Sequence, residues 1–76
     1  MTAVPGEVQS VTRALKLLSC LAAAHGGQRL TDLARSSGLA VSTVHRLLLT
    51  MQQAGFVHFG IGEAQEAQVR VRWPGA

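Results

Sequence analysis

The chain has 76 residues, which is the size of one small domain. With 47% apolar and 14% charged residues, its composition fits a folded chain better than a disordered one. Seven basic residues against four acidic ones give a net charge of +3, and residues 10–59 hold five basic residues and one acid. This balance suits a polyanionic partner.

Disulfide and membrane signals are lacking in the sequence. The single cysteine, Cys20, excludes an intramolecular disulfide, and a cytoplasmic protein is the default expectation. No run of about 18 apolar residues is present, so the sequence predicts no membrane-spanning helix.

Residues of the types that carry catalysis are scattered. Asp32 stands alone, and Cys20 has no histidine at helical spacing. His25, His45 and His58 fall on three separate predicted elements without the spacing of zinc ligands. No phosphate-binding glycine motif is present. The sequence therefore predicts no enzyme, no cofactor and no metal site.

A first helix is expected between Ser10, a good N-cap, and Gly26, after a flexible arm of residues 1–8. One apolar stripe at helical spacing comprises Val11, Ala14, Leu15, Leu18, Leu21 and Ala22. A second, partly apolar stripe on the other side comprises Leu17, Cys20 and Ala24. Two stripes are unusual for a helix with one face in water.

Two further helices follow. The segment 30–38 is expected to be a short helix capped by Thr31, with Asp32 in its first turn and Gly38 at its end. The next helix, expected over 42–54, has the clearest periodicity in the chain and ends before Gly55. Its apolar stripe comprises Val44, Leu47, Leu48, Met51 and Ala54.

After the third helix the apolar period changes from helix to strand. The segments 56–59 and 68–73 predict a hairpin, with Pro74 ending the second strand. In that strand Val69, Val71 and Trp73 share one face, and Arg70 and Arg72 share the other.

A short helix, a tight turn and a longer amphipathic helix form a helix-turn-helix pattern. The polar side of the longer helix holds Ser42, Arg46 and Gln53, flanked by Thr43, His45 and Thr50. Arginine can bind guanine through two hydrogen bonds, and hydroxyl groups serve bases or phosphates. No acid occurs from Leu33 through Gly62. An ordinary solvated helix face is the alternative.

Phosphate contacts are predicted for three further arginines, namely Arg35 on the second helix and Arg70 and Arg72 on the hairpin. The alternative for the two hairpin arginines is an edge strand protected by charge. Glu63 and Glu66 at the hairpin tip argue against deep insertion of the tip into DNA.

Two stretches carry a family resemblance: VQSVTRALKLLSCL at residues 8–21 and LTDLARSSGLAVSTVHRLLLTMQQAGFV at residues 30–57. They resemble the N-terminal winged helix-turn-helix domain of IclR-type bacterial transcription regulators. The resemblance covers about residues 8–57 and implies a mainly α domain with a small β-hairpin. With the hairpin placed from its strand pattern alone, the domain is expected over residues 9–73, followed by a tail of residues 74–76.

The resemblance also implies a function. In such proteins the third helix enters the major groove of a palindromic operator, and the first helix helps to pair two subunits. Pairing would give a use to the stripe of Leu17, Cys20 and Ala24. The family's effector-binding domain is not expected within these 76 residues, and therefore no small-molecule ligand is expected.

The sequence departs from the family pattern at the start of the third helix. Ala40 and Val41 stand where the family usually has proline and a basic residue, which predicts weaker binding with a flatter salt dependence. Leu49 occupies an outward position. These departures keep open a protein-binding winged helix or a weakly binding remnant of a regulator. RNA binding also stays open, because the basic faces would serve either nucleic acid.

Overall fold

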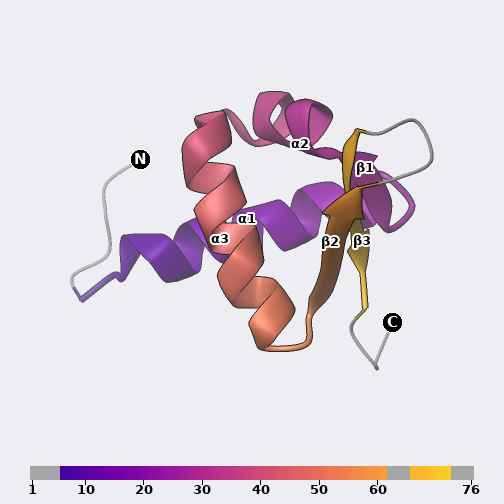
Figure 1. Ribbon diagram of the computed structural model, residues 1–76. Helices are drawn as coiled ribbons and strands as arrows, with labels where there is room; N and C mark the ends of the chain where they lie inside the picture. The colour runs from indigo at the N-terminus through magenta and orange to yellow at the C-terminus, as the bar shows by residue number, and fades with distance from the viewer. Residues whose placement is uncertain (1–5, 62–65, 73–76) are drawn as a thin grey trace.

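The computed structural model describes residues 6–61 and 66–72. In chain order these residues form α1 (Gln9–Ala23), β1 (Gly27–Arg29), α2 (Leu30–Ser37), α3 (Val41–Gln53), β2 (Val57–Ile61) and β3 (Ala67–Val71). Helix α3 crosses in front of α1, α2 lies beside the start of α3, and the strands lie to one side (Figure 1). The predicted winged helix-turn-helix is therefore confirmed. The hairpin tip, Trp73, the tail and residues 1–5 of the expected arm lie outside the described residues.

The core lies where the three helices meet the inner face of the sheet. Val44, Leu48 and Met51 of α3 are buried, as the periodicity of that helix predicts. The other buried apolar side chains are Leu17, Leu21, Leu33, Ala34, Val57 and Val69. Each structural element except β1 thus contributes at least one buried apolar side chain, which fixes α3 against the rest of the domain.

The orientation of α1 differs from the sequence-based expectation. Leu17 has no exposed surface and lies in the core, whereas Val11 and Leu15 are 55% and 57% exposed. The stripe of Leu17, Cys20 and Ala24 therefore does not form a surface for subunit pairing, and that assignment is wrong. Because α1 is apolar around most of its circumference, its periodicity does not determine which side faces α2 and α3.

The sheet contains one strand more than the predicted hairpin. Strands β2 and β3 pair antiparallel, with Val57 opposite Val71, and β1 adds to the other edge of β3. The strand order is β1-β3-β2, so β3 is central. The amide of Val71 also donates to the carbonyl of Gly26 at 2.7 Å, which extends the pairing toward α1. The three residues of β1 carry no alternating apolar pattern, and sequence reasoning therefore missed this strand.

The predicted C-terminal ends of the helices agree with the structure, but the predicted N-cap residues do not. Neither Ser10 nor Thr31 is an N-cap, since α1 begins at Gln9 after Val8 and α2 begins at Leu30 after Arg29. Gly38 ends α2 with a left-handed φ of 73°, a conformation that favours glycine. Within the described residues, no helix is long and apolar enough to cross a membrane.

A buried serine fixes the turn between α2 and α3. The Ser37 hydroxyl is 1% exposed, donates to the carbonyl of Ala34 at 3.1 Å and accepts from the amide of Leu39 at 3.3 Å. Both hydrogen bonds lie within the last turn of α2 and the short segment that connects it to α3. Ser37 therefore sets the direction in which α3 leaves the turn.

Candidate nucleic-acid interface

The start of α3 presents the predicted polar residues to solvent. Ser42 and Arg46 are exposed and Thr43 is half-buried, on the side of α3 opposite buried Val44 and Leu48. The side chain of Arg46 has no ion pair among residues 6–61 and 66–72. A rigid helix thus carries an unpaired guanidinium beside two hydroxyl groups, an arrangement suited to base edges and phosphates.

His45 lies between the polar side of α3 and the sheet. Its ring packs edge-to-face on Phe59 of β2, with ring centroids 5.3 Å apart and an interplanar angle of 80°. Edge-to-face contacts of this kind contribute about 0.5–1.5 kcal/mol. His45 therefore joins α3 to β2, a role that the sequence did not reveal.

Gln52 makes a second connection between α3 and β2. Its Oε1 accepts a 2.6 Å hydrogen bond from the backbone amide of Phe59. Sequence reasoning missed Gln52, because glutamine near the end of a helix is unremarkable and its partner lies seven residues away. Together with His45, this bond fixes the hairpin against the last two turns of α3.

Thr50 faces a different surface from the one predicted for it. Its hydroxyl donates back to the carbonyl of Arg46 at 3.4 Å. The side chain borders an open apolar groove between α1 and the end of α3, next to Val11, Leu15 and Phe56. Thr50 is thus separated from Ser42, near the start of α3, by two turns of helix.

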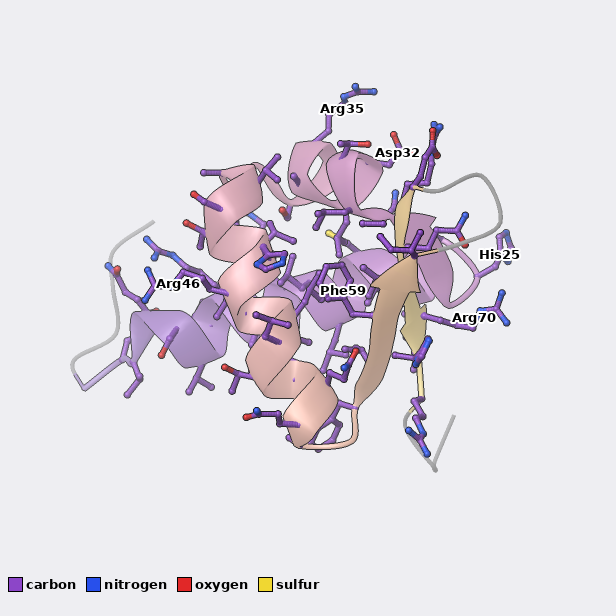
Figure 2. All side chains as sticks on the ribbon, viewed as in Figure 1. His25, Asp32, Arg35, Arg46, Phe59 and Arg70 are labelled. Atoms are coloured by element: carbon purple, nitrogen blue, oxygen red, sulfur yellow. The ribbon has the colours of Figure 1, made fainter. Side chains whose placement is uncertain are left out.

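Arg35 extends from α2 at the top of the view in Figure 2. Its side chain is 83% exposed, and its Nη1 lies 3.9 Å from Asp32 Oδ1. Asp32 is closer to Arg29, whose Nε donates to Oδ2 at 2.9 Å. Arg35 therefore keeps most of its hydrogen-bonding capacity for a partner in solution.

Arg29 acts as a cross-link between elements. Besides Asp32 of α2, its guanidinium contacts Glu66, just before β3, at 3.2 Å. The hydrogen bond with Asp32, followed by that with Glu66, raises the pKa of Arg29 above its ordinary value. Because both partners are acids, Arg29 is neutralised locally, unlike Arg46.

Arg70 and Arg72 lie on a surface separate from the start of α3. Both are exposed, on β3 and one residue beyond its end. Figure 2 shows Arg46 and Arg70 extending from opposite sides of the molecule. The structure therefore brings Ser42, Thr43 and Arg46 together and does not bring the two hairpin arginines to them.

Residues 10–59 match the model of the IclR helix-turn-helix domain. The chain belongs to this family. It is 59% identical over 54 residues to the acetate operon repressor of Salmonella typhimurium, and 53% identical over 64 residues to the transcriptional repressor IclR of Escherichia coli. These alignments cover 71% and 75% of this chain. The chain covers only 20% and 23% of the two relatives' lengths.

Solved structures share the fold of this IclR-family domain. A MarR family transcriptional regulator from Silicibacter pomeroyi superposes with a TM-score of 0.73 at 23% identity, over 84% of this chain and 42% of that one. The Zalpha domain of Carassius auratus PKZ, in complex with Z-DNA, gives a TM-score of 0.67 at 23% identity, over 80% of this chain and 95% of that one. At these identities the likeness shows the winged-helix fold alone.

Proposed function

We propose that this chain binds double-stranded DNA sequence-specifically in bacterial transcriptional regulation, with α3 in the major groove. The observation that supports this most strongly is the start of α3, where Arg46, Ser42 and Thr43 lie together on an exposed, acid-free side of a helix. An α-helix fits the major groove, and residues near its N-terminus reach base edges. Membership of a family whose matched relatives are repressors supports the same function.

Within this proposal each residue has a distinct task. Arg46 reads a guanine, Ser42 and Thr43 contact bases or phosphates, and Arg35 contacts the backbone from α2. His45 holds the sheet against α3 and contacts DNA at the edge of the major groove. Thr50, predicted as a contact at the margin, lies toward α1 and is the weakest member of this set.

Binding across a salt series and selection from random duplex DNA test the proposal. Arg46→Ala should weaken binding to the selected sequence by roughly 5- to 150-fold, since a bidentate guanine contact is worth about 1–3 kcal/mol. Lys16→Ala is the control. Lys16 is exposed, and because Ala14 and Leu18, two residues away on either side, pack against the core, its side chain points away from the core. This substitution should have little effect on DNA binding. A parent chain without salt-dependent binding at low ionic strength would refute DNA binding.

A protein-binding role is the second candidate, and two exposed apolar residues on α3 favour it. Val41 and Leu49 are 47% and 44% exposed, and Val41 stands beside Ala40 where a basic residue would strengthen DNA binding. The salt series separates these candidates, because apolar docking is little weakened by salt whereas phosphate binding falls steeply. Parallel measurements with duplex RNA test the remaining nucleic-acid alternative.

We also propose that two copies pair through α1 on a palindromic operator. The exposed side chains of Val11 and Leu15, with Val8 just before the helix, support this, since they form an apolar surface that the described residues leave uncovered. Pairing through this side replaces the earlier assignment to the buried Leu17.

A further inference from the structure

The outer face of the sheet is polar and basic. Along β3, Gln68 and Arg70 point away from the core, while Val69 between them is buried. The strand register places Gly27 of β1 and His58 of β2 on the two sides of Arg70. In the same way Gln68 lies between Arg29 and Gly60. No large apolar side chain belongs to this face within the described strands.

Two glycines make this face concave. Gly27 and Gly60 carry no side chain, so the sheet backbone forms the floor of an open groove bordered by His25, Arg70 and Arg72. A Cβ atom added at Gly60 would lie 3.5 Å from His58 Nε2, which shows that the imidazole covers Gly60 along the strand. A bound group could therefore approach the backbone closely at Gly27, with arginine and imidazole side chains around it.

Of the three arginines that line this groove, Arg29 is paired with Asp32 and Glu66, whereas Arg70 and Arg72 have no acidic partner in the described part of the chain. The ion pairs found there involve only Arg29 and Arg35. Charge protection of an exposed sheet edge does not explain Arg70 either, because β3 is the central strand and is paired on both sides. A pair of free guanidinium groups beside two imidazoles is thus left without a structural role.

The position of this groove separates it from the start of α3. Arg72 lies beside the end of α3, where its amide donates to the carbonyl of Phe56 at 2.9 Å. Arg46 extends from the opposite side of the domain to Arg70 and His25 (Figure 2). Arg70 and His25 therefore lie on a different side of the domain from the side chain of Arg46.

We propose that the outer groove of the sheet, formed by His25, His58, Arg70 and Arg72 around Gly27 and Gly60, binds the phosphate backbone of a second nucleic-acid segment. Guanidinium groups match phosphate oxygens in geometry as well as in charge. Arg70 and Arg72 are two residues apart on an extended chain, roughly 6.6 Å, so each can contact its own phosphate. An acidic peptide is the less suitable partner, because tight protein interfaces rely on several buried aromatic or aliphatic anchors, whereas Ile61, at the end of β2, is the one exposed large apolar side chain among the described residues that line this groove.

This inference goes beyond the proposed reading of DNA by α3. In this arrangement α3 binds one DNA segment through contacts to its bases, and the outer groove of the sheet binds a second segment through its phosphates alone. The second contact is expected to be weak, independent of sequence and strongly dependent on salt.

Stoichiometry with a short duplex tests the second surface. The 76-residue chain is sedimented at low salt with an excess of a labelled random duplex of about 10 base pairs, one helical turn. We expect two duplexes per chain for the parent and one for Arg70→Gln with Arg72→Gln. The control with Arg13→Gln and Lys16→Gln removes two exposed charges from α1 and should keep two duplexes. Arg70→Lys with Arg72→Lys retains the charges and should keep the second duplex at reduced affinity.

Amide chemical shifts of the ¹⁵N-labelled chain locate the contact and separate this inference from the proposed function. Duplex DNA should shift the amides of Gly27, His58 and Gly60 in the parent and equally in Arg46→Ala. If Arg70→Gln with Arg72→Gln leaves stoichiometry and shifts unchanged, the second surface does not exist. If the parent binds one duplex, and if both Arg46→Ala and the double variant lose it, the two surfaces form one shared site and the inference is overturned. Shifts at the two glycines with polyglutamate but not with duplex would overturn the choice of nucleic acid.

Discussion

The side-chain Oε1 of Gln52 accepts a 2.6 Å hydrogen bond from the backbone amide of Phe59, which joins the last turn of α3 directly to β2. This bond and the packing of His45 on the Phe59 ring come from the same side of α3. The hairpin is therefore held to α3 by side chains of that helix and not only by the core beneath it.

Gln52→Ala should destabilise the domain by about 0.5–1.5 kcal/mol, because it removes one hydrogen bond at an exposed site. Denaturant unfolding measures this change. Gln53→Ala is the matched control, since Gln53 is exposed on the outer side of α3 and should change stability by less than about 0.5 kcal/mol. Equal losses for the two variants would show that the bond to Phe59 contributes nothing specific.

Ser37→Ala should cost about 1–3 kcal/mol of stability, because the buried hydroxyl serves the carbonyl of Ala34 and the amide of Leu39. Thermal or denaturant unfolding provides the measurement. Ser42→Ala removes an exposed hydroxyl with no such bonds and should leave stability nearly unchanged while affecting DNA binding. A Ser37→Ala variant as stable as the parent would contradict the role given to this serine in the turn.

Arg46→Lys should separate affinity from specificity. Lysine keeps the positive charge, so the slope of log affinity against log salt should stay close to that of the parent. Lysine lacks the planar fork that binds guanine through two hydrogen bonds, so the sequence preference should relax. Selection from random duplex DNA measures the preference, and an unchanged selected sequence would place the reading contact elsewhere.

Leu15→Glu should prevent pairing of two chains without unfolding either one, because Leu15 is 57% exposed on α1. Sedimentation at rising concentration reports the mass, and circular dichroism reports the fold. Arg13→Gln changes the net charge by the same amount at an exposed position on the opposite side of α1 and serves as the control. Leu17→Glu, by contrast, should unfold the chain, because it buries an unpaired charge in the core. A parent chain that stays monomeric at all concentrations would contradict pairing through α1.

The sequence by itself determined the order of helices and hairpin strands and the inner side of α3. These features depend on short-range regularities: apolar residues at helical spacing from Val44 to Met51, Gly38 at the turn, and alternation around Val69 and Val71. The polar residues of α3 could be predicted with them, because the outward side of a helix follows once its inner side is known.

Only the tertiary structure decided the remaining features. Packing against α2 and α3 selected Leu17 rather than Leu15 for the core, since α1 offers apolar residues on both sides. Strand β1 forms because β3 presents backbone groups to it, with Gln28 opposite Val69, far apart in the chain. The opposed directions of Arg46 and Arg70 depend on how the sheet packs on the helices, and no local pattern encodes that angle.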